Sequence, residues 1–277
     1  MYLRPTELSE ALRALSSAPL AVLAGGTDFY AARVGQPVHE DVLDITALAG
    51  LRGVSEEQEC LRIGALVTWS ELARHPLPRL FDGLKQAARE VGGLQIQNAG
   101  TVVGNVCNAS PAADGIPPLL ALDAEVELAA LDGRRRLPLS EFVSGARATQ
   151  RRSDELVTAI LIPRWRRAAR STFRKIGARR YLVISIVMVA ETIELDTHGA
   201  VAHAAVAVGA CSEVAQRLPK LEARLVGKPL SSSLADAARP DDLAWLTPIS
   251  DVRGSAEYRR DAALTLVRRS LALLSSE

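Results

Sequence analysis

The sequence predicts an α+β protein with two domains, and three observations lead to this expectation. The chain has 277 residues, of which 48% are apolar, so it can bury a core large enough for two domains. The first part alternates short apolar runs with helical patterns, whereas the last part has three strand-like runs followed by helical segments. Between them lies the basic segment PRWRRAAR at 163–170, which is the best candidate for a domain boundary.

The first fifty residues resemble a small α/β unit. Apolar side chains at helical spacing predict a helix over 6–15, with Thr6 as a candidate N-cap. The run LAVLAGG at 20–26 predicts a buried strand that enters a tight turn, and DVLDI at 41–45 predicts a second strand. TALAGL, which follows it, predicts a short helix.

The next segment contains two helix signals and then an unusual stretch. Thr68 and Glu71 have the spacing of a capping box, and 79–92 predicts an amphipathic helix that ends at two glycines. The stretch 94–122 is dense in Gly, Asn, Ser, Ala and Pro but almost free of charge. Small uncharged residues in such number indicate backbone that lies against another protein layer or a bound ligand.

The remaining elements follow from apolar alternation and from breaker residues. AEVELAAL at 124–131, a GRRR turn at 133–136 and LPLSEFV at 137–143 predict a hairpin with a short helix after it. ELVTAILIP predicts a strand that Pro163 stops. Beyond the basic segment we expect three strands, the last two in hairpin order, and then helices; the strand segments are STFRKIGA, LVISIVMVAETIEL and AVAHAAVAVGAC, and the helical ones include PKLEARLVG and AEYRRDAALTLVRRSLALL.

Charge and cysteine content exclude several classes of function. The 33 basic residues nearly balance the 32 acidic ones, so no overall field favours nucleic acid or an anionic membrane. The sequence has neither a secretory signal pattern nor an apolar run long enough to span a membrane, so a cytoplasmic location is expected. Its cysteines and histidines are too dispersed to indicate a disulfide framework, an iron–sulfur centre or a zinc site; they are Cys60, Cys107, Cys211, His39, His75, His198 and His203.

Two glycine-containing segments are the candidate binding elements. AGGTDF at 24–29 follows an apolar strand, and its glycines let successive N–H groups approach an anion such as a pyrophosphate. TVVGNVCNASPAAD at 101–114 adds hydrogen-bonding side chains around Gly104. Taken alone, the first segment is more typical of a plain tight turn, and the second can be a buried turn that satisfies its own backbone. Neither a GxGxxG nor a GxxxxGK[ST] motif occurs, so a Rossmann dinucleotide site or a P-loop is not supported.

These two segments, together with ISDVRGSAEYRRD at 249–261, resemble the FAD-binding (medium) subunits of the molybdenum hydroxylase family, of the carbon monoxide dehydrogenase and xanthine dehydrogenase type. The resemblance spans nearly the whole chain. It implies an FAD-binding domain of the p-cresol methylhydroxylase (PCMH) type at 1–168, with α/β subdomains at about 1–52 and 53–168. A small C-terminal domain at 169–277, an antiparallel three-stranded sheet with helices, would follow.

The resemblance also implies roles for individual residues, none of them catalytic or metal-binding. The first motif would surround the pyrophosphate and adenosine portion of FAD with Ala24, Gly25, Gly26, Thr27, Asp28 and Phe29. The second would hold the rest of the cofactor, with Asp114 on its hydroxyl groups, through Thr101, Gly104, Asn105, Ser110 and Asp114. Leu156 and Val157 would line the flavin, and Lys175 matches a lysine of the following strand.

One position departs from the family pattern. The family often has TxGGN where this chain has TVVGN, so Val103 stands in place of a glycine. At that position the backbone must either keep a negative φ or lie farther from the cofactor.

The implied function is electron transfer. In this family a large subunit holds the molybdenum cofactor, a small subunit holds iron–sulfur clusters, and the FAD subunit passes electrons to an acceptor such as NAD, oxygen, a quinone or a cytochrome. A dimer of heterotrimers is the expected assembly. Two alternatives remain: a self-sufficient flavin oxidase or reductase of the same fold, and a scaffold subunit that has lost the cofactor.

Overall fold

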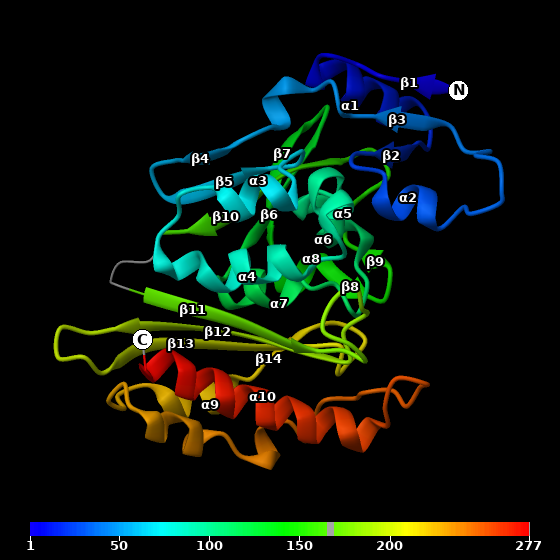
Figure 1. Cartoon of the computed structure of the whole chain (residues 1–277). Coiled ribbons are helices and arrows are strands. Elements are labelled where there is room, and N and C mark those ends of the chain that lie inside the picture. Colours follow the sequence, from blue (N-terminus) through cyan, green and yellow to red (C-terminus); the bar gives the residue numbers. More distant parts are fainter. Residues whose placement is uncertain (165–168, 277) are drawn as a thin grey trace.

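The computed structural model describes residues 1–164 and 169–276, and in it three sheets from successive parts of the chain lie one below the other (Figure 1). Helices cover and separate these sheets, which confirms the predicted α+β class. Residues 165–168, in the basic segment predicted as a boundary, lie outside the described residues.

The N-terminal sheet is parallel, with the strand order β1-β3-β2, and it carries the first glycine motif at its edge. Its elements are β1 (Tyr2–Leu3), α1 (Leu8–Ser17), β2 (Ala21–Leu23), α2 (Thr27–Ala31), β3 (Val42–Asp44) and η1 (Ala49–Leu51). Helix α1 buries Ala11, Leu12 and Leu15. The candidate N-cap Thr6 is wrong, because the helix begins later and its cap position is occupied by Glu7.

The middle sheet has the order β4-β5-β10-β6-β7, and all its neighbouring strands are antiparallel. Its strands are β4 (Val54–Glu56), β5 (Cys60–Gly64), β6 (Glu125–Ala130), β7 (Gly133–Pro138) and β10 (Leu156–Pro163). Central strand β10 is buried along almost its whole length, which explains its continuous apolar sequence. It ends at Pro163, as predicted.

Short helices and a two-stranded hairpin surround this sheet. They are α3 (Trp69–Arg74), η2 (Arg79–Phe81), α4 (Asp82–Glu90), α5 (Leu94–Ala99), α6 (Val102–Asn108), α7 (Ile116–Ala121), α8 (Leu139–Phe142), β8 (Val143–Gly145) and β9 (Ala148–Thr149). The helix predicted over 79–92 is divided into η2 and α4. The small-residue stretch 94–122 forms three of the helices, α5, α6 and α7.

The hairpin of β6 and β7 corrects one detail of the sequence interpretation. The predicted GRRR turn is wrong, because the turn lies at 131–132 and the three arginines belong to strand β7. Successive side chains of this edge strand point to opposite faces of the sheet. The Arg134 guanidinium lies 3.5 Å from the Glu127 carboxylate, and the Arg135 guanidinium lies 2.5 Å from the Glu155 carboxylate. Charged side chains on an edge strand discourage pairing with another chain.

The capping box at the start of α3 is confirmed. The Thr68 hydroxyl accepts from the Glu71 N–H at 3.2 Å, and the Glu71 carboxylate accepts from the Thr68 N–H at 2.7 Å. We expect Glu71→Ala to lower the free energy of unfolding by about 1 kcal/mol, because a helix-end N–H loses its acceptor. Urea unfolding measures this, with Glu10→Ala in α1 as the control; equal losses in the two variants would contradict the capping role.

The C-terminal sheet is antiparallel and lies between two helical layers (Figure 1). Its elements are β11 (Ala169–Ile176), β12 (Val187–Leu195), β13 (Val201–Gly209), β14 (Gln216–Arg217), α9 (Pro219–Leu225), η3 (Ser232–Ala237), η4 (Pro240–Asp242) and α10 (Ala256–Ser276). Helices α4 and α7 cover one face, and α9 and α10 cover the other. The three predicted strands and their hairpin order are confirmed, and the two-residue β14 extends the sheet.

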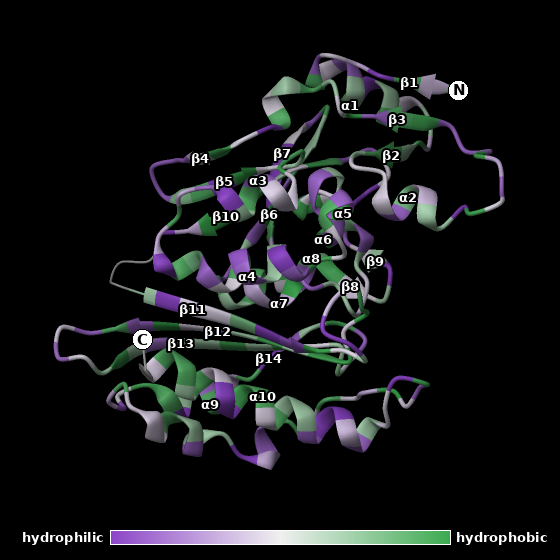
Figure 2. Ribbon diagram, in the orientation of Figure 1, coloured by the Kyte–Doolittle hydropathy of each residue, from purple (hydrophilic) through white to green (hydrophobic). Residues whose placement is uncertain are grey.

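Strands β12 and β13 are hydrophobic along most of their length because both faces are covered (Figure 2). Side chains of β12 alternate between two cores: Met188 and Ala190 join the core of the first two sheets, whereas Val187 and Val189 join the core under α10. The C-terminal domain thus shares one core with the rest of the chain.

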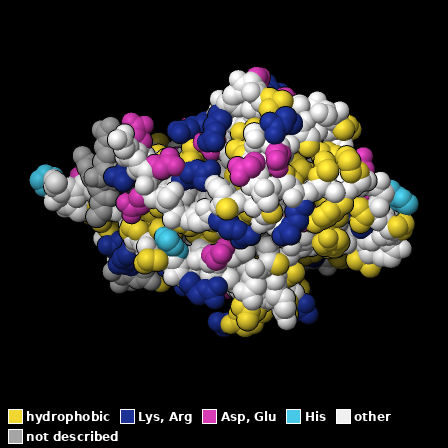
Figure 3. Space-filling model, turned by 90° about the horizontal axis from the view of Figure 1, so that it is seen from above, with side chains coloured by type: hydrophobic (Ala, Val, Ile, Leu, Met, Phe, Trp, Pro, Cys, Tyr) yellow, Lys and Arg dark blue, Asp and Glu magenta, His cyan; other side chains and the backbone are white. Residues whose placement is uncertain are grey.

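The surface seen in Figure 3 mixes acidic and basic side chains, in line with the small net charge. Hydrophobic side chains gather on the right of that view, over the N-terminal elements. Exposed apolar residues in this part of the chain are Met1, Tyr2, Tyr30, Val34 and Val38. Among the described residues, no helix is both long and apolar enough to span a membrane.

Candidate functional site

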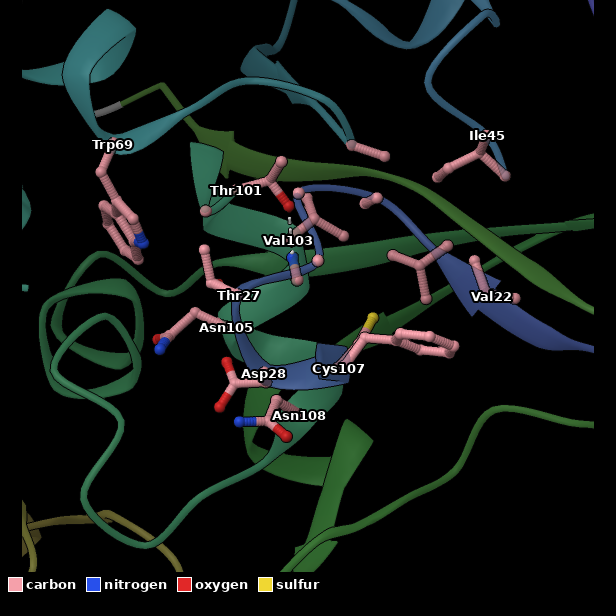
Figure 4. A pocket seen from close by; sticks show the side chains of 18 of the residues that line it. Val22, Thr27, Asp28, Ile45, Trp69, Thr101, Val103, Asn105, Cys107 and Asn108 are labelled. Atoms are coloured by element: carbon pink, nitrogen blue, oxygen red, sulfur yellow. Dashed lines mark hydrogen bonds between the residues drawn. The ribbon is translucent and has the colours of Figure 1, made fainter. Parts of the chain in front are cut away.

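A cavity of about 390 Å³ lies where the N-terminal unit meets the middle sheet (Figure 4). Its walls come from the β2–α2 segment, from α6 and from β10. Binding sites for small molecules commonly have volumes of about 300–1,000 Å³. Most of the predicted site residues line this cavity: Ala24, Gly25, Gly26, Thr27, Asp28, Phe29, Thr101, Gly104, Asn105, Leu156 and Val157.

The first wall depends on two glycines with different roles. Gly25 packs against the end of α5 so closely that a Cβ atom would lie 1.8 Å from the Ala99 carbonyl oxygen. Gly26 has a φ of +73°, a left-handed conformation that disfavours a side chain, and it caps α2. The first-turn N–H groups of a helix have no acceptor within it, so they can bind an anion.

The second wall is α6, whose start is organised by its own side chains. The Thr101 hydroxyl accepts from the Gly104 N–H at 2.9 Å, and the Asn105 side-chain oxygen accepts from the Gly115 N–H at 3.2 Å. Figure 4 shows Thr27 and Asp28 of α2 near Thr101, Asn105 and Asn108 of α6. Thr101 and Asn105 therefore shape this wall, as well as lining it.

Val103 is accommodated without a glycine conformation. It lies inside α6, has helical backbone geometry, and is 3% exposed. Of the two possibilities left by the sequence, the backbone keeps a negative φ. The Val103 side chain thus adds apolar surface to the wall of the cavity, which Val22 and Ile45 also line (Figure 4).

The start of β10 forms an apolar floor of the cavity. Leu156 and Val157 are buried at the start of β10, where the pairing with β6 has a bulge after Val157. Trp69, at the start of α3, is also buried and lines the cavity. An apolar floor beneath two polar loops suits a ligand with a flat ring system and a charged linker.

The lining residues that the sequence interpretation missed include Arg33, Cys107 and Arg151. Arg33 lies 3.9 Å above the Phe29 ring and donates to the Phe29 carbonyl at 2.7 Å. Arg33 also donates to the Glu40 carboxylate at 2.6 Å, and this hydrogen bond lowers the pKa of Glu40 to about 2. The spacing of Phe29 and Arg33, four residues apart in a helical segment, is a signal that could have identified the pair.

Cys107 also lines the cavity, where its side chain is exposed. Desolvation by the surrounding protein raises the pKa of its thiol, although the charge of Arg151 acts in the opposite direction. A raised pKa disfavours the thiolate, which is the form that acts as a nucleophile or metal ligand. Among residues 1–164 and 169–276, no cluster of histidine, cysteine and carboxylate side chains could hold a metal ion.

Three other predicted site residues, Ser110, Asp114 and Lys175, lie outside the cavity lining. Asp114 and Lys175 form a buried ion pair with 2.6 Å between Oδ2 and Nζ, although they are 61 residues apart in sequence. Ser185 donates to the other Asp114 oxygen, and Lys175 also donates to the Glu90 carbonyl at 3.0 Å.

The environment of Asp114 contains opposing effects. Burial raises the pKa of its carboxyl group, whereas the charge of Lys175 and the hydrogen bonds from Lys175 and Ser185 lower it. The pair joins the loop before α7 to strand β11, and so connects the middle unit to the C-terminal sheet. Ser110 accepts from the Ala112 N–H at 3.3 Å and so supports the same loop.

Comparison with known proteins gives a consistent identification. The family model of the FAD binding domain in molybdopterin dehydrogenase matches residues 1–165, and that of the CO dehydrogenase flavoprotein C-terminal domain matches residues 172–274. The nicotinate dehydrogenase FAD-subunit of Eubacterium barkeri is 30% identical, with 94% of this chain and 91% of the relative covered. The carbon monoxide dehydrogenase medium chain of Hydrogenophaga pseudoflava is 27% identical, with 98% and 95% covered.

Solved structures show the same similarity. Carbon monoxide dehydrogenase from Hydrogenophaga pseudoflava superimposes with a TM-score of 0.87 at 27% identity, covering 99% of this chain and 96% of the other. The reconstituted enzyme from Oligotropha carboxidovorans gives a TM-score of 0.89 at 26% identity, with 99% and 97% covered. The chain therefore belongs to the family of FAD-binding subunits of molybdenum hydroxylase-type dehydrogenases, and it is an oxidoreductase subunit.

Proposed function

We propose that this chain receives electrons from iron–sulfur clusters of a small partner subunit and delivers them, through FAD, to an external acceptor. The observation that carries the proposal is the cavity in which both glycine-containing segments meet over an apolar floor. Bound FAD supplies the redox chemistry, because a flavin can accept electrons singly and release them in pairs. The protein contributes the position and the electrostatic environment of the cofactor.

The residues of the cavity fit FAD in charge and in shape. Main-chain N–H groups around Gly25 and Gly26 suit the diphosphate, since glycines let the backbone approach it, and Gly104 allows the same close approach at α6. Leu156 and Val157 would support a ring system on the floor. We place Asp114 and Lys175 behind the site, where their ion pair fixes the loop that follows α6.

The partners are proposed from the family. FAD subunits of this type work with a large subunit that holds molybdopterin and with a small iron–sulfur subunit, and we propose a dimer of such heterotrimers. The acceptor is NAD, oxygen, a quinone or a cytochrome. The cytoplasmic location stays a prediction from the sequence.

We also propose that the domains are 1–168 and 169–277, with subdomains at about 1–52 and 53–168. Each of these three segments contains one of the three stacked sheets, which supports the division.

Purification from the native host tests the proposal. We expect two further chains to accompany this one, and metal analysis should find molybdenum and iron in the complex but not in this chain alone. FAD should remain with the isolated chain and show a flavin absorption spectrum. Rapid reduction of its flavin by an organic substrate without other subunits would favour a self-sufficient oxidase, and a colourless chain that takes up no FAD would favour a scaffold.

A further inference from the structure

The β8–β9 hairpin places Arg147 at the mouth of the cavity. Arg147 belongs to neither glycine-containing segment and is not among the residues that line the cavity. Its guanidinium Nη1 donates to the side-chain oxygen of Asn108 and lies 3.5 Å from the Asn108 carbonyl oxygen. The same Nη1 atom lies 4.0 Å from the Asp28 carboxylate. Asp28 of α2 and Asn108 of α6 lie close together at the cavity (Figure 4). One side chain, that of Arg147, therefore contacts both walls.

We propose that Arg147 is a positioning residue for FAD, which fastens α2 to α6 and compensates the charge of Asp28 beside the bound diphosphate. The inference rests on the assignment of FAD to this cavity. Asp28 lines a site that would take a dianionic group, and two negative groups at close range repel each other. The Arg147 guanidinium offsets this repulsion while it holds the two walls at a fixed separation.

The hairpin that carries Arg147 is anchored on both sides. The Arg147 N–H donates to the Ala109 carbonyl at 2.8 Å, at the end of α6. The neighbouring Ala146 N–H donates to the Glu213 carboxylate at 3.2 Å, in the C-terminal domain. Because both backbone contacts are independent of the arginine side chain, the hairpin can stay in place when that side chain is removed.

The backbone of Arg147 gives a second, independent indication. Its φ is +60°, in the left-handed region where glycine is the favoured residue. A side chain kept in an unfavourable backbone conformation is often retained for function. The chain thus carries an arginine at a turn where glycine would fold more easily.

Arg147→Gly is a sharp test because it removes the guanidinium and relieves the backbone strain together. In the full-length chain, we expect the Kd for FAD to rise about five- to tenfold, as for loss of an exposed charged hydrogen bond. The melting temperature of the FAD-free protein should stay unchanged or increase. Flavin fluorescence titration at low and moderate salt measures the Kd, and the difference between variant and wild type should shrink with added salt.

Three further variants isolate the charge and the position. Arg147→Lys should retain part of the affinity, and adding Asp28→Asn to Arg147→Gly should recover part of it, because the unpaired carboxylate is gone. The matched control is Arg164→Ala, since Arg164 is 56% exposed and pairs at 3.5 Å with Glu56 at the far end of β10; its Kd should equal that of the wild type.

The outcomes separate the inference from the proposed function. A Kd within twofold of the wild type in Arg147→Gly would overturn the role of Arg147, as would a loss of affinity that follows a parallel fall in melting temperature. A wild-type chain that binds no FAD would instead overturn the assignment of the cofactor, and the inference with it.

Discussion

Replacing Gly25 with alanine is expected to weaken FAD binding about ten- to a hundredfold. The new Cβ atom would lie 1.8 Å from the Ala99 carbonyl oxygen and 2.6 Å from its carbonyl carbon, and both belong to the backbone. A backbone segment cannot rotate away as a side chain can, so the first glycine segment must separate from the end of α5, which leads into the second segment. Overpacking of this kind costs about 1–3 kcal/mol, which corresponds to that change in affinity when it falls on the binding site.

Gly50→Ala is the matched control for this variant. Gly50 lies in η1 of the same N-terminal unit, and a Cβ atom there would meet no atom within 4 Å. Equilibrium titration with FAD should therefore give the wild-type Kd for Gly50→Ala and a much larger Kd for Gly25→Ala. Equal affinity in all three proteins would show that the contact between the loops does not shape the FAD site.

Replacing Lys175 with methionine is expected to lower the free energy of unfolding by about 3–5 kcal/mol near neutral pH. The Lys175 and Asp114 side chains are only 6% and 9% exposed, so the substitution leaves a carboxylate buried without its cation. Breaking a buried ion pair on one side carries a penalty of about this size. Urea unfolding of the full chain measures it.

The loss should depend on pH in a defined direction. Burial already raises the pKa of Asp114, and removal of Lys175 raises it further, above the value in the unfolded chain. A group with a raised pKa in the folded state stabilises the fold when it is protonated, and this contribution is lost as the pH rises through the folded pKa. We therefore expect a smaller deficit at pH 5.5 than at pH 8.

A double variant, Lys175→Met with Asp114→Asn, tests whether charge is the cause. The asparagine amide can still accept from Ser185 but carries no charge. Most of the lost stability should return at both pH values. A deficit that is independent of pH and persists in the double variant would instead indicate that the packing of the lysine stem matters most.

Local signals explain why so much of the site could be predicted from sequence. A strand that ends in AGGTDF and a helix cap at TVVGN are encoded within a few residues, and both are recognisable as family motifs. The capping box of Thr68 and Glu71 is equally local. Such local features depend only on residues close in sequence, so they can be predicted without knowing the rest of the fold.

Long-range features could not be predicted in the same way. The pairing of Asp114 with Lys175 brings the loop before α7 together with strand β11, 61 residues later, and nothing in either segment specifies the other. The Arg147 contacts likewise depend on how the β8–β9 hairpin packs against α2 and α6. The first residue of α1 could not be predicted reliably either. A proline followed by a threonine, and apolar residues at helical spacing, indicate a helix but do not determine which residue occupies its N-cap position.

A crystal structure of the full chain grown with FAD tests the central claim most directly. We expect the diphosphate to lie against the main chain of Gly25, Gly26 and Gly104, with ring atoms over Leu156 and Val157. Electron density for FAD at another place, or glycine loops closed against each other with the cavity empty, would contradict the account.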